Sequence, residues 1–168
     1  ILMEVGTGKI LFEKNKDERV SVASLTKMMA QILILEEVEK GNLKWDEKIT
    51  TSANAAGYGG TQIYLEPGEV MTAKELMKGI SMASANDATV AMAERIAGSE
   101  AKFVEMMNNK SKELGLQNTN FVNPTGLDEE NHYSSSYDLS MIARELLKHD
   151  KILEFTSIYE DYLRQDTT

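Results

Sequence analysis

Residues 21–40, SVASLTKMMAQILILEEVEK, decide the fold, because they predict a long helix from Ser24 to Lys40. Gly41 follows, and a glycine after the last turn is a common helix end. The apolar side chains of this segment point in nearly every direction around the helix axis: Leu25, Met28, Met29, Ile32, Leu33, Ile34 and Leu35. A helix that is apolar on all sides belongs in the middle of a domain. We therefore expect a central helix whose N-terminus reaches the interior or the floor of a cleft.

The segments around this helix predict a β-hairpin followed by more helices. Two short apolar runs, 1–5 and 9–12, flank a glycine-rich reversal and favour a hairpin. Residues 41–68 are broken by glycines, and we expect little regular structure there. Further helices are predicted at residues 72–82, 87–97, 99–115, 135–148 and 151–159. A hairpin followed by many helices indicates an α+β fold.

Composition excludes several classes of function. The 168 residues carry 18 basic and 27 acidic side chains, a net charge of −9, which argues against binding to nucleic acid. There is no Cys, which excludes thiolate metal sites and thiol nucleophiles, and the two His make a His-rich metal site improbable. We expect His132 to be solvated in a polar loop, and Trp45 and Tyr64 to be packing residues. Because Ile1 lies inside the first predicted strand without an initiator Met, we expect a mature or trimmed piece.

Ser24 and Lys27 are the first candidates for chemistry. Positions i and i+3 are neighbours on a helix, about 5–6 Å apart at Cβ. A lysine amine can act as general base for a serine hydroxyl when the amine is neutral. Only about 0.04 % of a free lysine is neutral at pH 7, so the amine needs apolar surroundings that lower its pKa. The pattern alone is weak, since Ser99 and Lys102 match it equally well in a place where Ser99 is expected to cap a helix.

Ser84 and Asn86 lie in a predicted break between two helices, which can project side chains into a cleft. A serine hydroxyl there can relay a proton, and an amide can hold a substrate carbonyl. The alternative interpretation is that Asn86 or Asp87 merely caps the next helix. Ser52 and Asn54 repeat the same S-x-N spacing.

Taken together, the chain resembles a known family. Residues 21–29, SVASLTKMM, resemble the nucleophile motif of the low-molecular-weight penicillin-binding proteins, and more narrowly of the serine D-alanyl-D-alanine carboxypeptidases. Ser84-Ala85-Asn86 follows at about the distance of the family's S-x-N motif. Further segments match in the same order: LEPGE at 65–69, NDA at 86–88, VAMA at 90–93, LGL at 114–116, NPTGL at 123–127 and YSS at 133–135. Several segments in order are more specific than any one motif.

This resemblance implies a β-lactamase/transpeptidase-like fold, here the helical lobe (21–168) with a hairpin (1–20) of an incomplete antiparallel sheet. Ser24 would attack the terminal D-Ala–D-Ala bond of peptidoglycan stem peptides, with Lys27 as general base. Ser84 would shuttle a proton, and Asn86 would bind substrate. β-Lactam antibiotics would acylate the same serine, and no cofactor or metal is expected. The family implies an extracytoplasmic location, with the usual membrane anchor beyond Thr168.

Two departures from the family pattern stand out. The family's third motif, K-T-G on a later strand, is absent, since the only basic residues after Asp150 are Lys151 and Arg164. The resemblance thus implies a single, truncated catalytic domain over 1–168, and leaves open whether it acts alone. The second departure is Thr125, which stands where relatives often have His.

Two other functions remain as alternatives. A class A-like β-lactamase shares the first two motifs, but it uses a Glu in an E-x-x-L-N loop, and residues 117–127 contain no Glu. A non-catalytic binding module with the same fold is the second alternative, and the presence of all four candidate residues argues against it.

Overall fold

The computed structural model describes residues 1–164, and it has the α+β composition that the sequence predicts. The strands are β1 (Leu2–Met3), β2 (Ile10–Phe12), β3 (Lys48–Thr50) and β4 (Val70–Thr72). A 3₁₀ turn, η1 (Ala23–Thr26), leads into the first of seven helices in the described part of the chain. These helices are α1 (Lys27–Glu39), α2 (Ala53–Ala56), α3 (Ala73–Ala83), α4 (Asn86–Ala97), α5 (Glu100–Glu113), α6 (Ser136–Leu146) and α7 (Lys151–Thr156).

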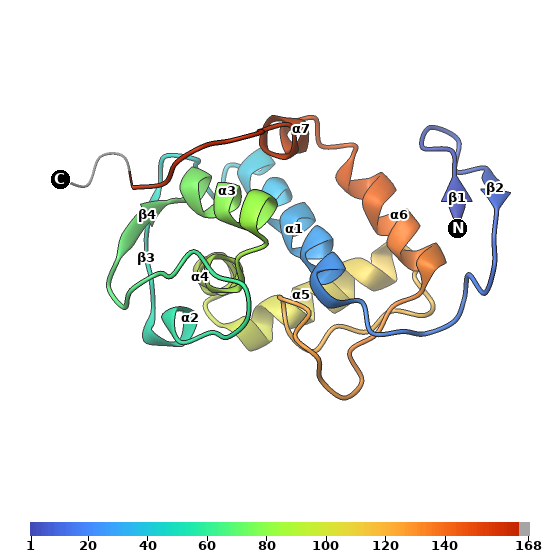
Figure 1. Cartoon of the computed structure of the whole chain (residues 1–168), viewed down its shortest axis with the longest axis horizontal. Helices are drawn as coiled ribbons and strands as arrows, with labels where there is room; N and C mark the ends of the chain where they lie inside the picture. Colours follow the sequence, from blue (N-terminus) through green and yellow to red (C-terminus); the bar gives the residue numbers. More distant parts are fainter. Residues whose placement is uncertain (165–168) are drawn as a thin grey trace.

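Helix α1 is the centre of the molecule, as its all-round apolar pattern predicts. Met29, Ile32 and Ile34 are fully buried although they point in different directions. Helices α4, α5 and α6 each pack against α1, and Figure 1 shows α1 crossing the middle of the structure between α4 and α6. A helix enclosed on all sides buries apolar surface on every face, and each Å² buried stabilises the fold by about 25 cal/mol. This packing fixes the N-terminal end of α1, where the candidate nucleophile lies.

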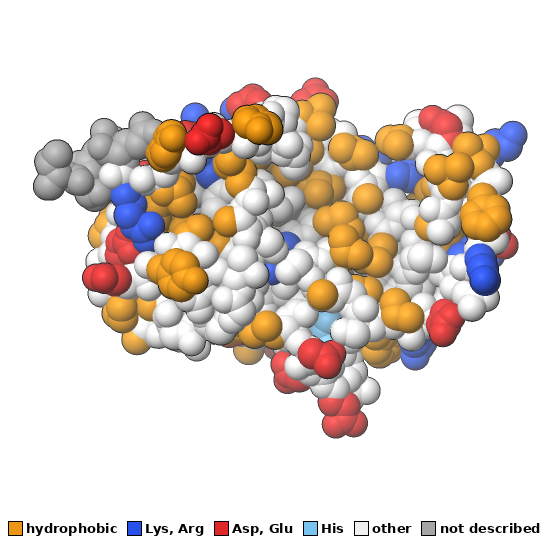
Figure 2. Space-filling view, in the orientation of Figure 1, with side chains coloured by type: hydrophobic (Ala, Val, Ile, Leu, Met, Phe, Trp, Pro, Cys, Tyr) orange, Lys and Arg blue, Asp and Glu red, His pale blue; other side chains and the backbone are white. Residues whose placement is uncertain are grey.

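The predicted N-terminal hairpin is present and lies beside α6. Strands β1 and β2 are antiparallel, with Leu2 opposite Phe12. The Arg144 side chain of α6 donates to the backbone oxygens of Val5 (2.8 Å) and Gly6 (3.3 Å), which ties the hairpin turn to the helix. Leu2 and Phe12 are exposed, and Figure 2 shows hydrophobic side chains over this part of the surface.

The prediction of little regular structure over residues 41–68 is confirmed for most of this segment, but it missed one short strand and one short helix. Strand β3 lies in this segment and pairs antiparallel with β4, with Lys48 opposite Thr72 and Thr50 opposite Val70. Helix α2 also lies there, and Ser52 caps it by accepting a hydrogen bond from the Ala55 amide (2.9 Å). Each element has only three or four residues, too few to show a hydrophobic period.

The helix boundaries differ from the predicted ones at several ends. The helix predicted from Ser24 starts as η1 and becomes α-helical at Lys27. The capping box at Thr72 and Glu75 is present at the start of α3. Neither Asn86 nor Asp87 caps α4, because the N-cap residue is Ala85. The helices predicted to end at 148 and 159 end at Leu146 and Thr156.

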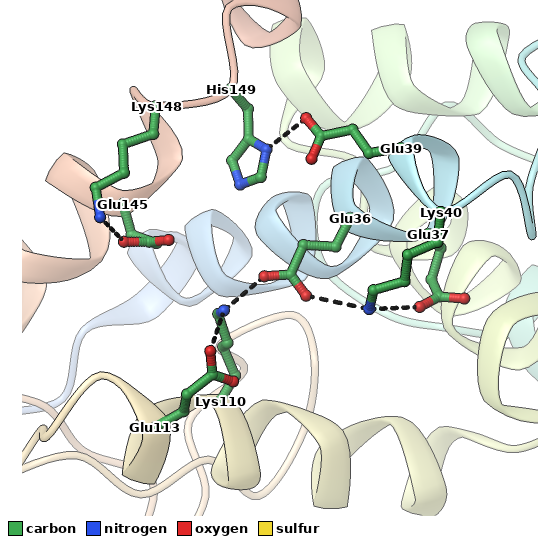
Figure 3. A network of polar contacts seen from close by, with 9 residues as sticks. All are labelled: Glu36, Glu37, Glu39, Lys40, Lys110, Glu113, Glu145, Lys148 and His149. Atoms are coloured by element: carbon green, nitrogen blue, oxygen red, sulfur yellow. Dashed lines mark hydrogen bonds and ion pairs between the residues drawn. The ribbon is translucent and has the colours of Figure 1, made fainter.

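A network of charged side chains joins the C-terminal half of α1 to the helices around it (Figure 3). The Lys110 ammonium of α5 contacts the carboxylates of Glu36 (2.6 Å) and Glu113 (3.0 Å). Burial alone would lower the pKa of Lys110, but the hydrogen bonds with these two carboxylates outweigh it and raise the pKa. Beyond α6, His149 Nδ1 lies 2.7 Å from Glu39 Oε1. These contacts anchor α1 at the end opposite to Ser24.

None of the helices over residues 1–164 is long and apolar enough to cross a membrane. The same residues contain no group of three or more His, Cys, Asp or Glu side chains that could hold a metal ion.

Candidate active site

Ser24 and Lys27 lie where the 3₁₀ turn η1 joins α1. The Lys27 Nζ atom is 3.1 Å from Ser24 Oγ, so the spacing prediction that the two side chains are neighbours is confirmed. Ser24 is exposed, whereas Lys27 is only 3 % exposed. The two groups therefore lie on either side of the boundary between solvent and protein interior. Figure 2 shows basic side-chain atoms recessed among neutral atoms near the middle of the visible face.

Burial changes the chemistry of Lys27. Desolvation lowers the pKa of its ammonium from 10.5 to about 8. At pH 7 about one tenth of such an amine is neutral, compared with far less than a thousandth of a free lysine. Lys27 Nζ also donates to the backbone oxygen of Thr125 at 2.8 Å. A neutral amine with one N–H directed to that carbonyl keeps its lone pair for the Ser24 hydroxyl.

The segment 123–127 presents this carbonyl in a fixed position. The Asn123 side-chain oxygen accepts hydrogen bonds from the backbone amides of Thr125 (3.2 Å) and Gly126 (2.7 Å). Gly126 has a φ of +84°, and a Cβ atom there would lie 1.8 Å from the Ala23 backbone oxygen. Only glycine allows this backbone to lie directly against η1. The close contact places the Thr125 carbonyl against Lys27.

Ser84 and Asn86 lie at the junction of α3 and α4, as predicted. Ser84 is the C-cap of α3 and has a left-handed backbone with a φ of +55°. Its Oγ atom is buried and has no hydrogen-bond partner among residues 1–164. The Asn86 side chain donates to the Gly59 backbone oxygen (2.7 Å), and its backbone amide donates to the backbone oxygen of Thr61 (2.7 Å). A strained backbone and an unsatisfied buried hydroxyl are features that cluster at functional sites.

Residues 126 and 127 link the Ser24–Lys27 pair to the segment that carries Ser84 and Asn86. Within residues 1–164 no hydrogen bond joins Ser84 or Asn86 to Ser24 or Lys27. A Cβ atom on Gly60 would lie 2.6 Å from Asn86 Nδ2 and 3.3 Å from Leu127 Cδ2. Leu127 directly follows the glycine that contacts η1. The motif of α3–α4 and the motif of η1 thus both lie close to this short segment.

The second S-x-x-K pattern has no such geometry. Ser99 caps α5, accepting a hydrogen bond from the Lys102 amide at 3.3 Å, and Lys102 is exposed. The second S-x-N pattern also serves structure, since Ser52 caps α2 and Asn54 donates to Glu94 (2.9 Å).

The structure corrects two predictions and adds residues that the sequence did not indicate. His132 is not solvated: it is 4 % exposed, and its Nε2 lies 2.8 Å from Thr26 Oγ1. Tyr64 is not a packing residue, because it is 79 % exposed, whereas Trp45 does pack, against Phe155. The Thr125 carbonyl was not predicted, since backbone atoms carry no residue-type signal.

Asp87 also contributes to the site although sequence reasoning gave it only a capping role. Its fully buried carboxylate accepts hydrogen bonds from the backbone amides of Ile63 (3.2 Å), Leu65 (2.9 Å) and Ala88 (2.8 Å). These contacts hold residues 59–65 against the start of α4. That loop in turn supplies the acceptor of the Asn86 side chain.

Comparison with known proteins assigns the family. A family model described as D-alanyl-D-alanine carboxypeptidase, peptidase S11, matches residues 1–168. The chain belongs to this family. It is 58 % identical over 167 residues to the D-alanyl-D-alanine carboxypeptidase DacF of Bacillus subtilis (strain 168), covering 99 % of this chain and 43 % of DacF. It is 38 % identical over 154 residues to DacA of Escherichia coli (strain K12), covering 88 % of this chain and 38 % of DacA.

Solved structures of this carboxypeptidase family and of other penicillin-binding proteins share the fold. PBP3 from Streptococcus pneumoniae, described as a peptidoglycan synthesis regulatory factor, superimposes with a TM-score of 0.92 at 32 % identity, covering 96 % of this chain and 50 % of that one. Penicillin-binding protein D2 from Listeria monocytogenes, in its ampicillin-bound form, superimposes with a TM-score of 0.82 at 32 % identity, covering 93 % of this chain and 64 % of that one. The expected penicillin-binding/transpeptidase fold is therefore confirmed. The chain spans about two fifths of the length of the curated relatives.

Proposed function

We propose that this chain carries the nucleophile and proton-transfer groups of a penicillin-sensitive serine D-Ala-D-Ala carboxypeptidase. The single observation that carries the proposal is the 3.1 Å contact between an exposed Ser24 hydroxyl and a buried Lys27 amine. The pKa of that amine is lowered to about 8, into the range that a general base near neutral pH requires. Membership of the carboxypeptidase family supports the same chemistry.

In the proposed reaction, Ser24 Oγ attacks the carbonyl carbon of the last peptide bond in a stem peptide that ends in D-Ala-D-Ala. Its proton moves to Lys27 Nζ, which the Thr125 carbonyl holds in place. The tetrahedral intermediate collapses when the C–N bond breaks, and Ser84 passes the proton that Lys27 accepted to the leaving D-Ala amine, which leaves Lys27 neutral again. Water then hydrolyses the ester on Ser24 and releases the shortened peptide. Asn86 binds the substrate through its amide.

The buried hydroxyl of Ser84 supports its proposed role. An unpartnered hydroxyl is free to rotate and to bond a substrate atom or a neighbouring amine, whereas one engaged in a cap is not. The left-handed backbone of Ser84 costs about 1–2 kcal/mol for a residue with a Cβ, so the fold maintains this position against strain.

β-Lactam antibiotics are the second proposed class of ligand, because they acylate the same serine. The ampicillin-bound form of the Listeria monocytogenes relative supports this. The proposed substrate is a peptidoglycan stem peptide, which places the proposed site of action outside the plasma membrane of a bacterium. Any membrane contact is proposed to lie in segments outside residues 1–168. The proposal invokes no cofactor.

The test uses the full-length protein that contains this chain and a fluorescent penicillin. Covalent labelling is expected in the wild type and is expected to be lost in Ser24→Ala. Ser99→Ala is the matched control, because it removes the serine of the other S-x-x-K pattern and is expected to label normally. Release of D-Ala from a peptide ending in D-Ala-D-Ala then identifies the carboxypeptidase.

Two results would overturn this assignment. Labelling that survives Ser24→Ala would remove the nucleophile, and a wild type that never labels would make the chain a non-catalytic module. Rapid multiple turnover of a chromogenic cephalosporin would instead indicate a β-lactamase.

A further inference from the structure

A single imidazole bridges the two segments that hold the Ser24–Lys27 pair. His132 Nε2 lies 2.8 Å from Thr26 Oγ1, and the backbone amide of Val122 donates to His132 Nδ1 at 3.1 Å. An amide N–H can only donate, so Nδ1 must be the unprotonated nitrogen. The neutral ring therefore carries its proton on Nε2 and donates it to the Thr26 hydroxyl.

Both partners of this imidazole belong to the candidate active site. Thr26 is 1 % exposed and lies in the chain between Ser24 and Lys27, in η1. Val122 immediately precedes Asn123, whose side chain shapes the backbone that presents the Thr125 carbonyl. The ring thus connects the turn that carries the nucleophile with the segment that orients the general base.

We propose that His132, as a neutral imidazole, is a positioning residue that sets the distance between Ser24, Lys27 and the Thr125 carbonyl. This inference rests on the proposed function, since it assumes that Ser24 is the nucleophile. His132 touches neither Ser24 nor the expected substrate atoms in this structure. It acts through Thr26 and Val122.

Protonation of this ring would break the bridge. A second proton would sit on Nδ1 and face the Val122 N–H, so two donors would point at each other. Burial lowers the pKa of His132, while the nearby carboxylates Asp128 and Glu129, on the same loop, oppose that shift and raise it. From the other packed segments the ring meets the uncharged Thr26 hydroxyl and the edge of Phe121, at 5.9 Å between ring centroids.

Thr26, whose hydroxyl contacts His132, immediately precedes Lys27 in the chain, so at low pH a charged imidazole would form near the Lys27 ammonium. The ring is thus neutral near pH 7 and becomes charged only at lower pH. Its protonation and that of Lys27 both slow acylation as the pH falls. Their effects separate because Lys27 titrates at about 8 and His132 below its ordinary value.

The pH dependence of penicillin labelling tests this inference in the full-length protein. Below pH 8 the logarithm of the labelling rate is expected to fall by about one per pH unit, from Lys27 alone. At lower pH the wild type is expected to steepen toward about two per unit, as His132 also takes up a proton. His132→Gln keeps a donor and an acceptor but does not titrate, so it is expected to label and to keep a slope of about one.

Further variants separate positioning from mere stability. His132→Ala and Thr26→Val each remove one half of the bridge, and each is expected to lower the labelling rate at pH 8 at least about tenfold. Thr26→Ser keeps the hydroxyl and is expected to label at about the wild-type rate. His149→Gln is the matched control: this second histidine pairs with Glu39, at the other end of α1, and its replacement is expected to leave rate and slope unchanged.

Each outcome decides the inference. A His132→Gln profile that steepens at low pH as the wild type does would overturn it. Normal labelling by His132→Ala would do the same. Labelling that persists in Ser24→Ala refutes the proposed function itself, which is a separate result.

Discussion

Gly126→Ala is expected to disable Ser24, the proposed nucleophile, by moving the turn that carries it. The new Cβ would lie 1.8 Å from the Ala23 backbone oxygen, and real Cβ contacts under 3.0 Å essentially do not occur. The two segments would therefore separate by at least about 1.2 Å, the difference between these distances. A displacement of about 1 Å in a catalytic group can cost about a hundredfold in rate. The left-handed backbone adds about 1–2 kcal/mol of destabilisation.

Gly98→Ala separates the two effects. Gly98 has nearly the same backbone, with a φ of +79°, but a Cβ there meets nothing within 4 Å. The Gly98→Ala variant is expected to lose about 1–2 kcal/mol of unfolding free energy in urea denaturation while keeping the wild-type rate of penicillin labelling. Gly126→Ala is expected to lose more stability and to label about a hundredfold more slowly. Equal labelling rates in the two variants would refute the claim that this contact positions Ser24.

Penicillin labelling is expected to accelerate with a midpoint near pH 8 as the pH rises from 6 to 9, because the neutral fraction of Lys27 grows through its pKa of about 8; a rate that peaks at pH 5 would contradict this. Asp87→Ala leaves three backbone amides without their acceptor, so it is expected to cost about 3 kcal/mol of unfolding free energy in urea denaturation and to slow labelling. No loss of stability would contradict the role of this carboxylate. Thr72→Ala removes the cap of α3 and is expected to cost about 1 kcal/mol with labelling unchanged, and Thr72→Ser is expected to retain most of that stability.

The parts of the fold that the sequence predicts well are those set by local pattern. The central position of α1 follows from apolar residues on every side of it, and burial of Ile32 and Ile34 confirms it. The contact between Ser24 and Lys27 follows from their spacing, which survives although the first turn is 3₁₀ rather than α. Helical neighbours at i and i+3 stay close in both geometries.

The parts that the sequence does not predict depend on distant partners. His132 stands among polar residues in the chain, and it is buried because Thr26, 106 residues earlier, lies against it. The pairing of β3 with β4 joins three-residue strands that carry no periodic signal of their own. The exposure of Tyr64 likewise depends on a loop held by Asp87, and no local rule specifies it.

The position of Ser24 at the protein surface has a consequence for the size of molecule that can reach it. Its hydroxyl meets solvent, while the amine proposed to activate it is enclosed 3.1 Å away. In the described part of the chain, Ser24 is exposed, so a large acyl donor does not have to pass through a closed cavity to reach its hydroxyl. The dry amine behind it keeps its basicity in the same wet setting. Within residues 1–164, an exposed hydroxyl in front of a dry amine combines access for a bulky acyl donor with a base that burial keeps reactive.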